Sequence, residues 1–231
     1  GKPGMYSYVS LAPDGEYLRV TTVQRPFSNI VPVGQFANVN ELWTLDGEVI
    51  EELSSQEIRD GRSQDRNNNN EEPEKRQIRW RPDGNGISYL LKEAPPKKEE
   101  DNGDNGDDTN GDDANGDQEE TEEEKPERKR PMDQVIHWFP PYGEEDFEVI
   151  YRTKNDIRRL DYSEDCQILF ITERESGTEH VYAVFLDNPE ETFTIYKHQT
   201  REFYENPGSL LTKAGAMGVG AVRLSEDESA V

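Results

Sequence analysis

The stretch "SLAPDGEYLRV", residues Ser10–Val20, consists of a Pro-Asp-Gly corner followed by an alternating run of apolar and polar residues. Its outline recurs in "RWRPDGNGISYLL" (Arg79–Leu91) and in "DYSEDCQILFI" (Asp161–Ile171). A fourth, shorter copy, "RLSEDESAV" (Arg223–Val231), stands at the end of the sequence. Because such corners between alternating runs are typical of a turn that joins two strands, the sequence predicts the same strand pair four times.

The spacing of the corners indicates a repeat. We interpret six residues as structural corner positions: Asp14, Gly15, Asp83, Gly84, Asp165 and Asp227. The four aspartates are 69, 82 and 62 residues apart, and two polar segments, 54–76 and 95–130, lengthen the first two intervals. Without these segments of 23 and 36 residues both intervals are 46 residues long. That length falls within the range of about 40–50 residues for a four-stranded, WD40-like propeller blade.

Each of the first three intervals also contains a second predicted hairpin. These are "ELWTLDGEVIEEL" (Glu41–Leu53), "QVIHWFPPYGEEDFEVIYRT" (Gln134–Thr153) and "HVYAVFLDNPEETFTIYKH" (His180–His198). Sustained 3.6-residue apolar periodicity does not occur outside the loops, so helices should be few. We therefore expect an all-β fold, a partial β-propeller of four-stranded antiparallel blades with about three blades and the start of a fourth. The alternative is that Pro-Asp-Gly corners are simply common in antiparallel proteins.

The domain prediction treats residues 1–231 as one propeller fragment with a polar loop insertion at 54–76 and an acidic disordered insertion at 95–130. The acidic segment holds 15 Asp+Glu against 6 Lys+Arg and has no aromatic residue. Such a composition buries too little apolar surface to offset the entropy of ordering. Its clustered oxygens also admit a calcium-binding hypothesis, although no copy fits a twelve-residue loop with a closing Glu.

Composition excludes several classes of function. A net charge of −24 argues against a nucleic-acid partner, which requires a basic surface. No apolar run reaches the length of about 18 residues that a membrane span needs. Cys166 is the only cysteine, so neither an intrachain disulfide nor a site with several thiolates is possible. We expect a soluble protein, cytoplasmic or periplasmic, and the sequence leaves its oligomeric state open.

The chain offers little catalytic chemistry. It contains no Gly-x-Ser-x-Gly pattern, which a nucleophile elbow requires, and Ser209 is interpreted as a turn residue. The three histidines are interpreted as strand residues: His137, His180 and His198. The glycine cluster at 215–221 lacks the strand-to-helix context of a phosphate loop. We therefore predict no catalytic residue, no metal ligand and no cofactor, and we expect this chain alone not to be an enzyme.

Several segments resemble one peptidase family. "YSYVSLAPDGEYLRVTTVQRPFSNIVPVGQF" (Tyr6–Phe36), "RQIRWRPDGNGISYLL" (Arg76–Leu91) and "FYENPGSLLTK" (Phe203–Lys213) are similar to the propeller of glutamyl endopeptidases in the prolyl oligopeptidase family. The resemblance implies a two-domain serine peptidase in which the propeller limits access of peptides to an α/β-hydrolase domain with a Ser, Asp and His triad. That domain would follow the propeller, and peptide substrates would be its partners. The polar loop from Ser54 departs from the group's pattern and leaves the preference for glutamate open.

A substrate role is predicted for two residues. Arg25 and Phe27 would contact peptides, with Arg25 attracting acidic side chains toward the central opening of the propeller. The structural alternative for Arg25 is an ion pair with a carboxylate of a neighbouring blade. At the level of the whole protein, the alternative function is an interaction module without a hydrolase domain.

Overall fold

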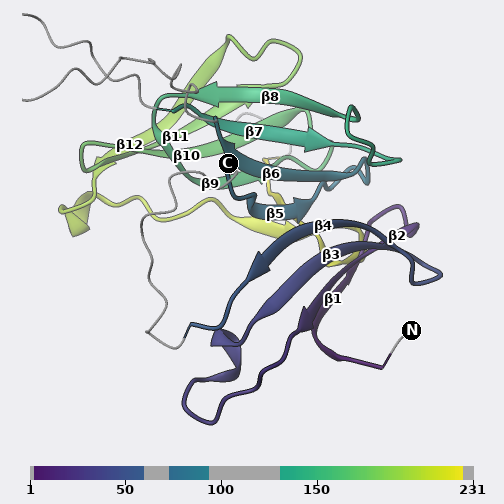
Figure 1. Cartoon of the computed structure of the whole chain (residues 1–231). Coiled ribbons are helices and arrows are strands. Elements are labelled where there is room, and N and C mark those ends of the chain that lie inside the picture. Colours follow the sequence, from purple (N-terminus) through teal and green to yellow (C-terminus); the bar gives the residue numbers. More distant parts are fainter. Residues whose placement is uncertain (1–2, 60–72, 94–130, 226–231) are drawn as a thin grey trace, which may run out of the picture.

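The computed structural model describes residues 3–59, 73–93 and 131–225, and almost all of its regular structure is β (Figure 1). The first sheet contains β1 (Met5–Leu11), β2 (Tyr17–Val23), β3 (Asn38–Thr44) and β4 (Val49–Gln56). The second contains β5 (Arg76–Trp80), β6 (Ile87–Lys92), β7 (Asp133–Trp138) and β8 (Phe147–Thr153). The third contains β9 (Asp156–Tyr162), β10 (Ile168–Glu175), β11 (Thr178–Phe185) and β12 (Thr192–Gln199).

Each sheet is an antiparallel meander in which consecutive strands are neighbours. A shorter sheet follows, made of β13 (Thr212–Ala214) and β14 (Gly220–Val222). The described helices are single 3-10 turns: η1 (Val33–Gln35), η2 (Phe203–Glu205) and η3 (Ala216–Gly218). Three four-stranded blades and the beginning of a fourth are the partial propeller that the sequence predicts, so the fold prediction is confirmed.

The three described corners have the same geometry. In each, the corner amide donates to the carbonyl three residues earlier: Gly15 to Ala12 at 2.9 Å, Gly84 to Arg81 at 3.1 Å and Cys166 to Ser163 at 3.1 Å. Each corner aspartate also accepts the amide two residues later, at 2.9 to 3.1 Å. All three corner residues have positive φ, which glycine adopts without steric cost and Cys166 adopts at 55° despite its Cβ. Asp227 lies outside the described residues.

The structure moves both limits of the first polar segment. The polar loop predicted at 54–76 is shorter at both ends, because Ser54–Gln56 continue β4 and Arg76 begins β5. Polar residues suffice there because β4 is the outer edge of its sheet and much of it is exposed. The long third interval is explained by β13 and η3, which precede β14. The acidic segment 95–130 lies outside the described residues.

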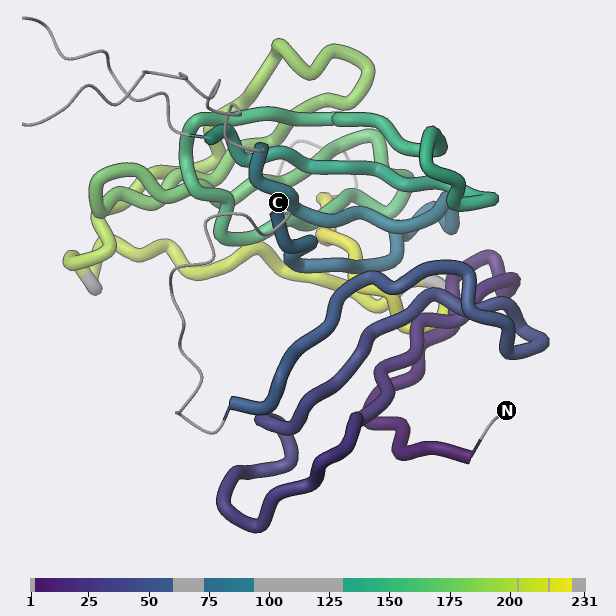
Figure 2. Tube along the Cα trace, in the orientation of Figure 1, coloured from purple at the N-terminus to yellow at the C-terminus, as the bar shows by residue number. Residues whose placement is uncertain are grey.

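The apolar core lies between successive sheets. One buried cluster joins the first and second sheets: Ala12, Leu42, Leu53, Trp80, Ile87, Tyr89, Ile136, Trp138 and Tyr142. Another joins the second and third, and includes Leu90, Val135, Leu160 and Leu169. Val222 of β14 packs with Phe170 and Ala183 of the third sheet. Figure 2 shows the last described segment returning from the far end of the third sheet to the junction of the sheets.

Gly86→Ala tests the closeness of this packing. Gly86 has φ +87°, and a Cβ there would stand 2.3 Å from the backbone oxygen of Trp138. We expect the substitution to reduce the free energy of unfolding by at least about 2 kcal/mol, because backbone cannot move aside cheaply. Gly15→Ala is the matched control, since Gly15 also has positive φ but no atom lies within 4 Å. It should cost about 1 kcal/mol. Equal losses in urea denaturation would contradict the proposed clash.

Candidate functional site

A cavity of about 530 Å³ lies where the first strands of the three sheets meet the start of β14. Its lining includes Tyr8 and Ser10 of β1, Gln77 and Arg79 of β5, Arg159 and Asp161 of β9, and residues 217–220. In each of these three strands, two residues that line the cavity stand four and six positions before the corner aspartate. We call this space the axial cavity, because the inner strand of every described blade contributes to it.

Charge in the axial cavity is concentrated on four side chains. Arg79 Nη1 lies 2.9 Å from Asp161 Oδ1, and Arg159 Nε donates to the other oxygen of the same carboxylate. Asp161 is 9% exposed at its side chain, whereas Arg79 and Arg159 are 34% and 45% exposed. Arg19 of β2 is the third arginine of the lining. Three arginines and one aspartate give the lining a formal charge of +2 in a chain of −24.

Hydrogen bonds between sheets hold the walls of the axial cavity in place. Trp80 Nε1 donates to Ser10 Oγ at 3.0 Å, which connects the second sheet to the first. Gln77 Nε2 donates to the carbonyl of Arg158 at 2.7 Å, which connects the second sheet to the third. Arg19 donates to the carbonyl of Ile78, and burial lowers the pKa of its guanidinium. The basic side chains are therefore positioned by contacts that cross blade boundaries.

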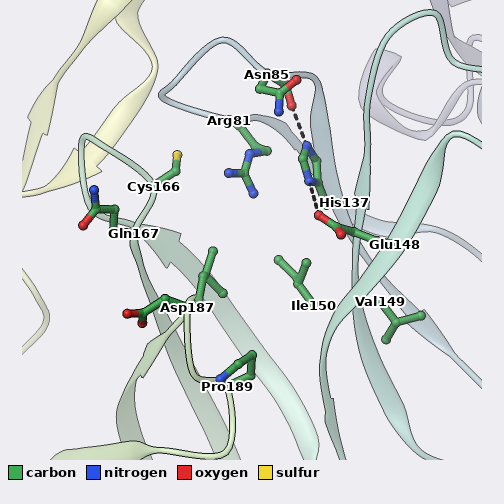
Figure 3. A pocket seen from close by; sticks show the side chains of 11 residues that line it. Arg81, Asn85, His137, Glu148, Val149, Ile150, Cys166, Gln167, Asp187 and Pro189 are labelled. Carbon is green, nitrogen blue, oxygen red and sulfur yellow. Dashed lines mark hydrogen bonds and ion pairs between the residues drawn. The ribbon is translucent and has the colours of Figure 1, made fainter.

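A second cavity, of about 640 Å³, lies between the second and third sheets beside their corners (Figure 3). His137 stands on its wall with Nδ1 2.9 Å from Glu148 Oε1 and Nε2 2.6 Å from the carbonyl oxygen of Asn85. Cys166 also lines it, and burial together with the charge of Asp83 raises the pKa of the thiol to about 12. A protonated thiol is a poor nucleophile, so the position of Cys166 at the third corner is a structural one.

The residues predicted for substrate contact lie elsewhere. Arg25 and Phe27 belong to the connection between β2 and β3, where the guanidinium carbon of Arg25 lies 5.5 Å from the ring centre of Phe27. Phe27 in turn stacks on Phe36 at 5.9 Å. Neither Arg25 nor Phe27 lines either cavity, and their contact with substrate stays a prediction.

The remaining sequence candidates have structural positions. His180 and His198 are strand residues of the third sheet, as interpreted, and Ser209 lies in the irregular segment between η2 and β13. The glycine cluster at 215–221 forms the hairpin between β13 and β14, in which Gly215 donates to the carbonyl of Val219. Within the described residues, no group of three or more His, Cys, Asp or Glu could hold a metal ion. The described part also contains no helix with the length and apolarity that a membrane span requires.

The sequence analysis missed the axial arginines. Their signal lies in the repeat itself: aligning the corners puts Tyr8, Gln77 and Arg159 at one position, and Ser10, Arg79 and Asp161 at another. Polar residues at alternate positions in all three inner strands indicate a shared polar face. A single stretch of sequence shows only one such face, and the faces converge only when the three sheets pack together.

Asp161→Asn tests whether the shared carboxylate holds the axial cavity together. We expect the substitution to reduce the free energy of unfolding by about 2 kcal/mol, because two arginines lose a charged acceptor that is largely buried. The control is Asp156→Asn, which removes the exposed pair with Lys92, whose side chains are 47% and 52% exposed. That change should cost at most about 0.5 kcal/mol. Thermal and urea unfolding of both variants measure the difference, and similar losses would contradict the assignment.

The chain is similar to known proteins over part of its length. No protein-family model matches the chain. The chain is 38% identical over 95 residues to a probable chloroplastic glutamyl endopeptidase of Oryza sativa subsp. japonica, a match that covers 39% of this chain and 10% of the relative. It is 40% identical over 53 residues to the protein of the same description from Arabidopsis thaliana, covering 23% and 6%. The chain thus spans a tenth or less of the length of these relatives in the matched segments.

Two solved structures are similar in part. A prolyl endopeptidase has a TM-score of 0.41 at 14% identity, covering 84% of this chain and 22% of that one. A hydrazine synthase of Kuenenia stuttgartiensis has a TM-score of 0.34 at 13% identity, covering 78% and 39%. The partial sequence matches, both to probable glutamyl endopeptidases, agree with the resemblance of the corner segments to the prolyl oligopeptidase family of peptidases.

Proposed function

We propose that this chain is the noncatalytic propeller region of a serine-type peptidase and that it controls which peptides reach a hydrolase domain. The observation that carries the proposal is the axial cavity, a net positive lining at the meeting point of the inner strands of a strongly acidic chain. The chain itself has no Gly-x-Ser-x-Gly sequence, so the nucleophile is proposed to lie outside residues 1–231.

The charge of the axial cavity suits peptides with acidic side chains. A concave surface of one charge raises the local concentration of oppositely charged ligands and speeds their association. Arg79 and Arg159 share one carboxylate, so their positive charge exceeds the negative charge that they contact. Both curated relatives are named glutamyl endopeptidases, and we extend an acidic-peptide preference to this chain as part of the proposal.

Labelling with a serine-directed fluorophosphonate tests the peptidase assignment. The full-length protein that contains this chain should be labelled at one serine, and peptide mapping should place that serine outside residues 1–231. Labelling inside these residues would contradict a noncatalytic role. Failure to label an active-site serine anywhere would favour the alternative, an interaction module without a hydrolase domain.

Arg159→Gln tests steering by the axial cavity. In the full-length peptidase we expect kcat/KM for a glutamate-containing peptide to fall about three- to tenfold at low ionic strength, with a smaller loss for the neutral glutamine peptide. The difference should shrink as salt is added, because screening weakens long-range attraction.

The control for this experiment is Arg158→Gln. Arg158 is adjacent in β9 and 55% exposed, but it does not line the axial cavity. The Arg158→Gln substitution should change kcat/KM little for either the glutamate or the glutamine peptide.

Arg25→Ala, measured on the same two peptides, tests the substrate contact that the sequence predicts for Arg25. Equal losses on acidic and neutral peptides in Arg159→Gln would remove the axial cavity from substrate selection.

A further inference from the structure

Arg79 and Arg159 of the axial cavity form a pair of cations that one carboxylate only half neutralises. Arg79 contacts one oxygen of Asp161 through Nη1, and Arg159 contacts the other through Nε. The remaining N–H groups of both guanidinium forks belong to partly exposed side chains, where a ligand can reach them. The pair therefore keeps one positive charge and free hydrogen-bond donors beside the cavity.

Arg19 adds a second uncompensated charge from the first sheet. Its Nε donates to Asn40 Oδ1 at 3.3 Å and its Nη1 donates to the backbone carbonyl of Ile78, so both acceptors are neutral. Burial lowers the pKa of this guanidinium, and the nearby charge of Arg79 also lowers it. An anion close to Arg19 and Arg79 would relieve both effects.

The balance of charge favours a ligand with two negative charges. Apart from the three arginines and Asp161, the residues that line the axial cavity are neutral, which gives the formal charge of +2. One uncompensated charge lies on the first sheet and the other on the pair that joins the second and third sheets. Two separate carboxylates match this arrangement better than one compact anion, and a planar fork suits the geometry of a carboxylate.

The neutral part of the lining suits a peptide unit. Ser10 Oγ accepts a hydrogen bond from Trp80 Nε1 at 3.0 Å, so the hydroxyl hydrogen of Ser10 can still be donated. Gln77 Nε2 donates to the carbonyl of Arg158 at 2.7 Å, which leaves Oε1 of Gln77 as an acceptor. The volume of about 530 Å³ lies within the range of about 300–1,000 Å³ that is typical of small-ligand sites.

We propose that the axial cavity binds a peptide that ends in glutamate, whose side-chain and terminal carboxylates belong to one residue. One carboxylate accepts hydrogen bonds from Arg79 and Arg159, and the other is held near Arg19. The inference rests on the proposed function in taking a peptide as the ligand. It adds that acidic peptides are retained in the axial cavity after they arrive, so a peptide with this terminus competes with incoming substrate.

Calorimetric titration of the intact protein with acetyl-Ala-Ala-Glu tests this site. We expect saturable binding at low ionic strength that weakens as salt is added. Acetyl-Ala-Ala-Gln lacks the side-chain carboxylate, and the α-amide of acetyl-Ala-Ala-Glu lacks the terminal one. Each of these peptides, and inorganic phosphate, should bind at least about tenfold more weakly. Absence of saturable binding would overturn the proposal, as would equal binding of either singly charged peptide or of phosphate.

Prior reaction with the serine-directed fluorophosphonate separates this inference from the proposed function. Binding of acetyl-Ala-Ala-Glu should persist in the labelled protein, because the axial cavity contains no reactive serine of a nucleophile elbow. Loss of binding after labelling would place the peptide in a hydrolase site, which overturns the inference and leaves the peptidase assignment intact. Binding by a protein that the reagent does not label would support the inference and contradict the peptidase assignment.

Two variants place the binding in the axial cavity. Arg159→Gln removes one fork and one charge, and it should weaken binding of acetyl-Ala-Ala-Glu at least about tenfold. Thr212→Trp puts a large side chain at an exposed position of β13 that lines the cavity, and it should block binding without altering the arginines. Arg158→Gln, adjacent in β9 but outside the lining, is the matched control and should leave binding unchanged. Circular dichroism checks folding; if Arg159→Gln is unfolded, unchanged binding by Thr212→Trp overturns the proposal by itself.

Discussion

The carboxylates of the three described corner aspartates, Asp14, Asp83 and Asp165, provide the constraint on which the rest of the structure depends. By accepting the amide two residues later, each carboxylate closes the turn and fixes where the second strand of the blade begins. The register of the inner strand follows, since residues four and six positions before the aspartate then face the axis. Trp80 and Tyr162, three positions before it, are buried at 3% and 1% exposure. One local hydrogen bond thus orders both the polar axis and the packing between blades.

Much of the architecture could be predicted from the sequence because its signals are local. The Asp46-Gly47 and Asp187-Asn188-Pro189 turns join strands as predicted, and the first two corner intervals become equal once the polar segments are removed. The limits of the loop after β4 were misplaced because an edge strand tolerates polar residues. The hairpin of β13 and β14 was missed because its glycines carry no alternating pattern.

The candidate site was less predictable, for a physical reason. Arg25 stands beside an aromatic residue and draws attention in the sequence, whereas Arg79 and Arg159 are ordinary polar positions of two strands 80 residues apart. Their significance arises only when two blades pack and place both guanidinium groups on Asp161. Convergence of this kind depends on tertiary packing. An alignment of the repeats nevertheless indicates two positions per blade whose side chains face the axis.

The corner of the third blade differs from the others in one useful respect. Where the first two corners have glycine, it has Cys166, the only cysteine of the chain and 4% exposed. The low exposure of this sulfur slows its reaction with a thiol reagent while the corner stays packed, and no second thiol obscures the reaction. The alkylation rate therefore reports local opening between the second and third blades, in the same way that amide exchange reports the opening of a hydrogen bond. Cys166 is therefore a natural probe of the opening kinetics at this blade boundary.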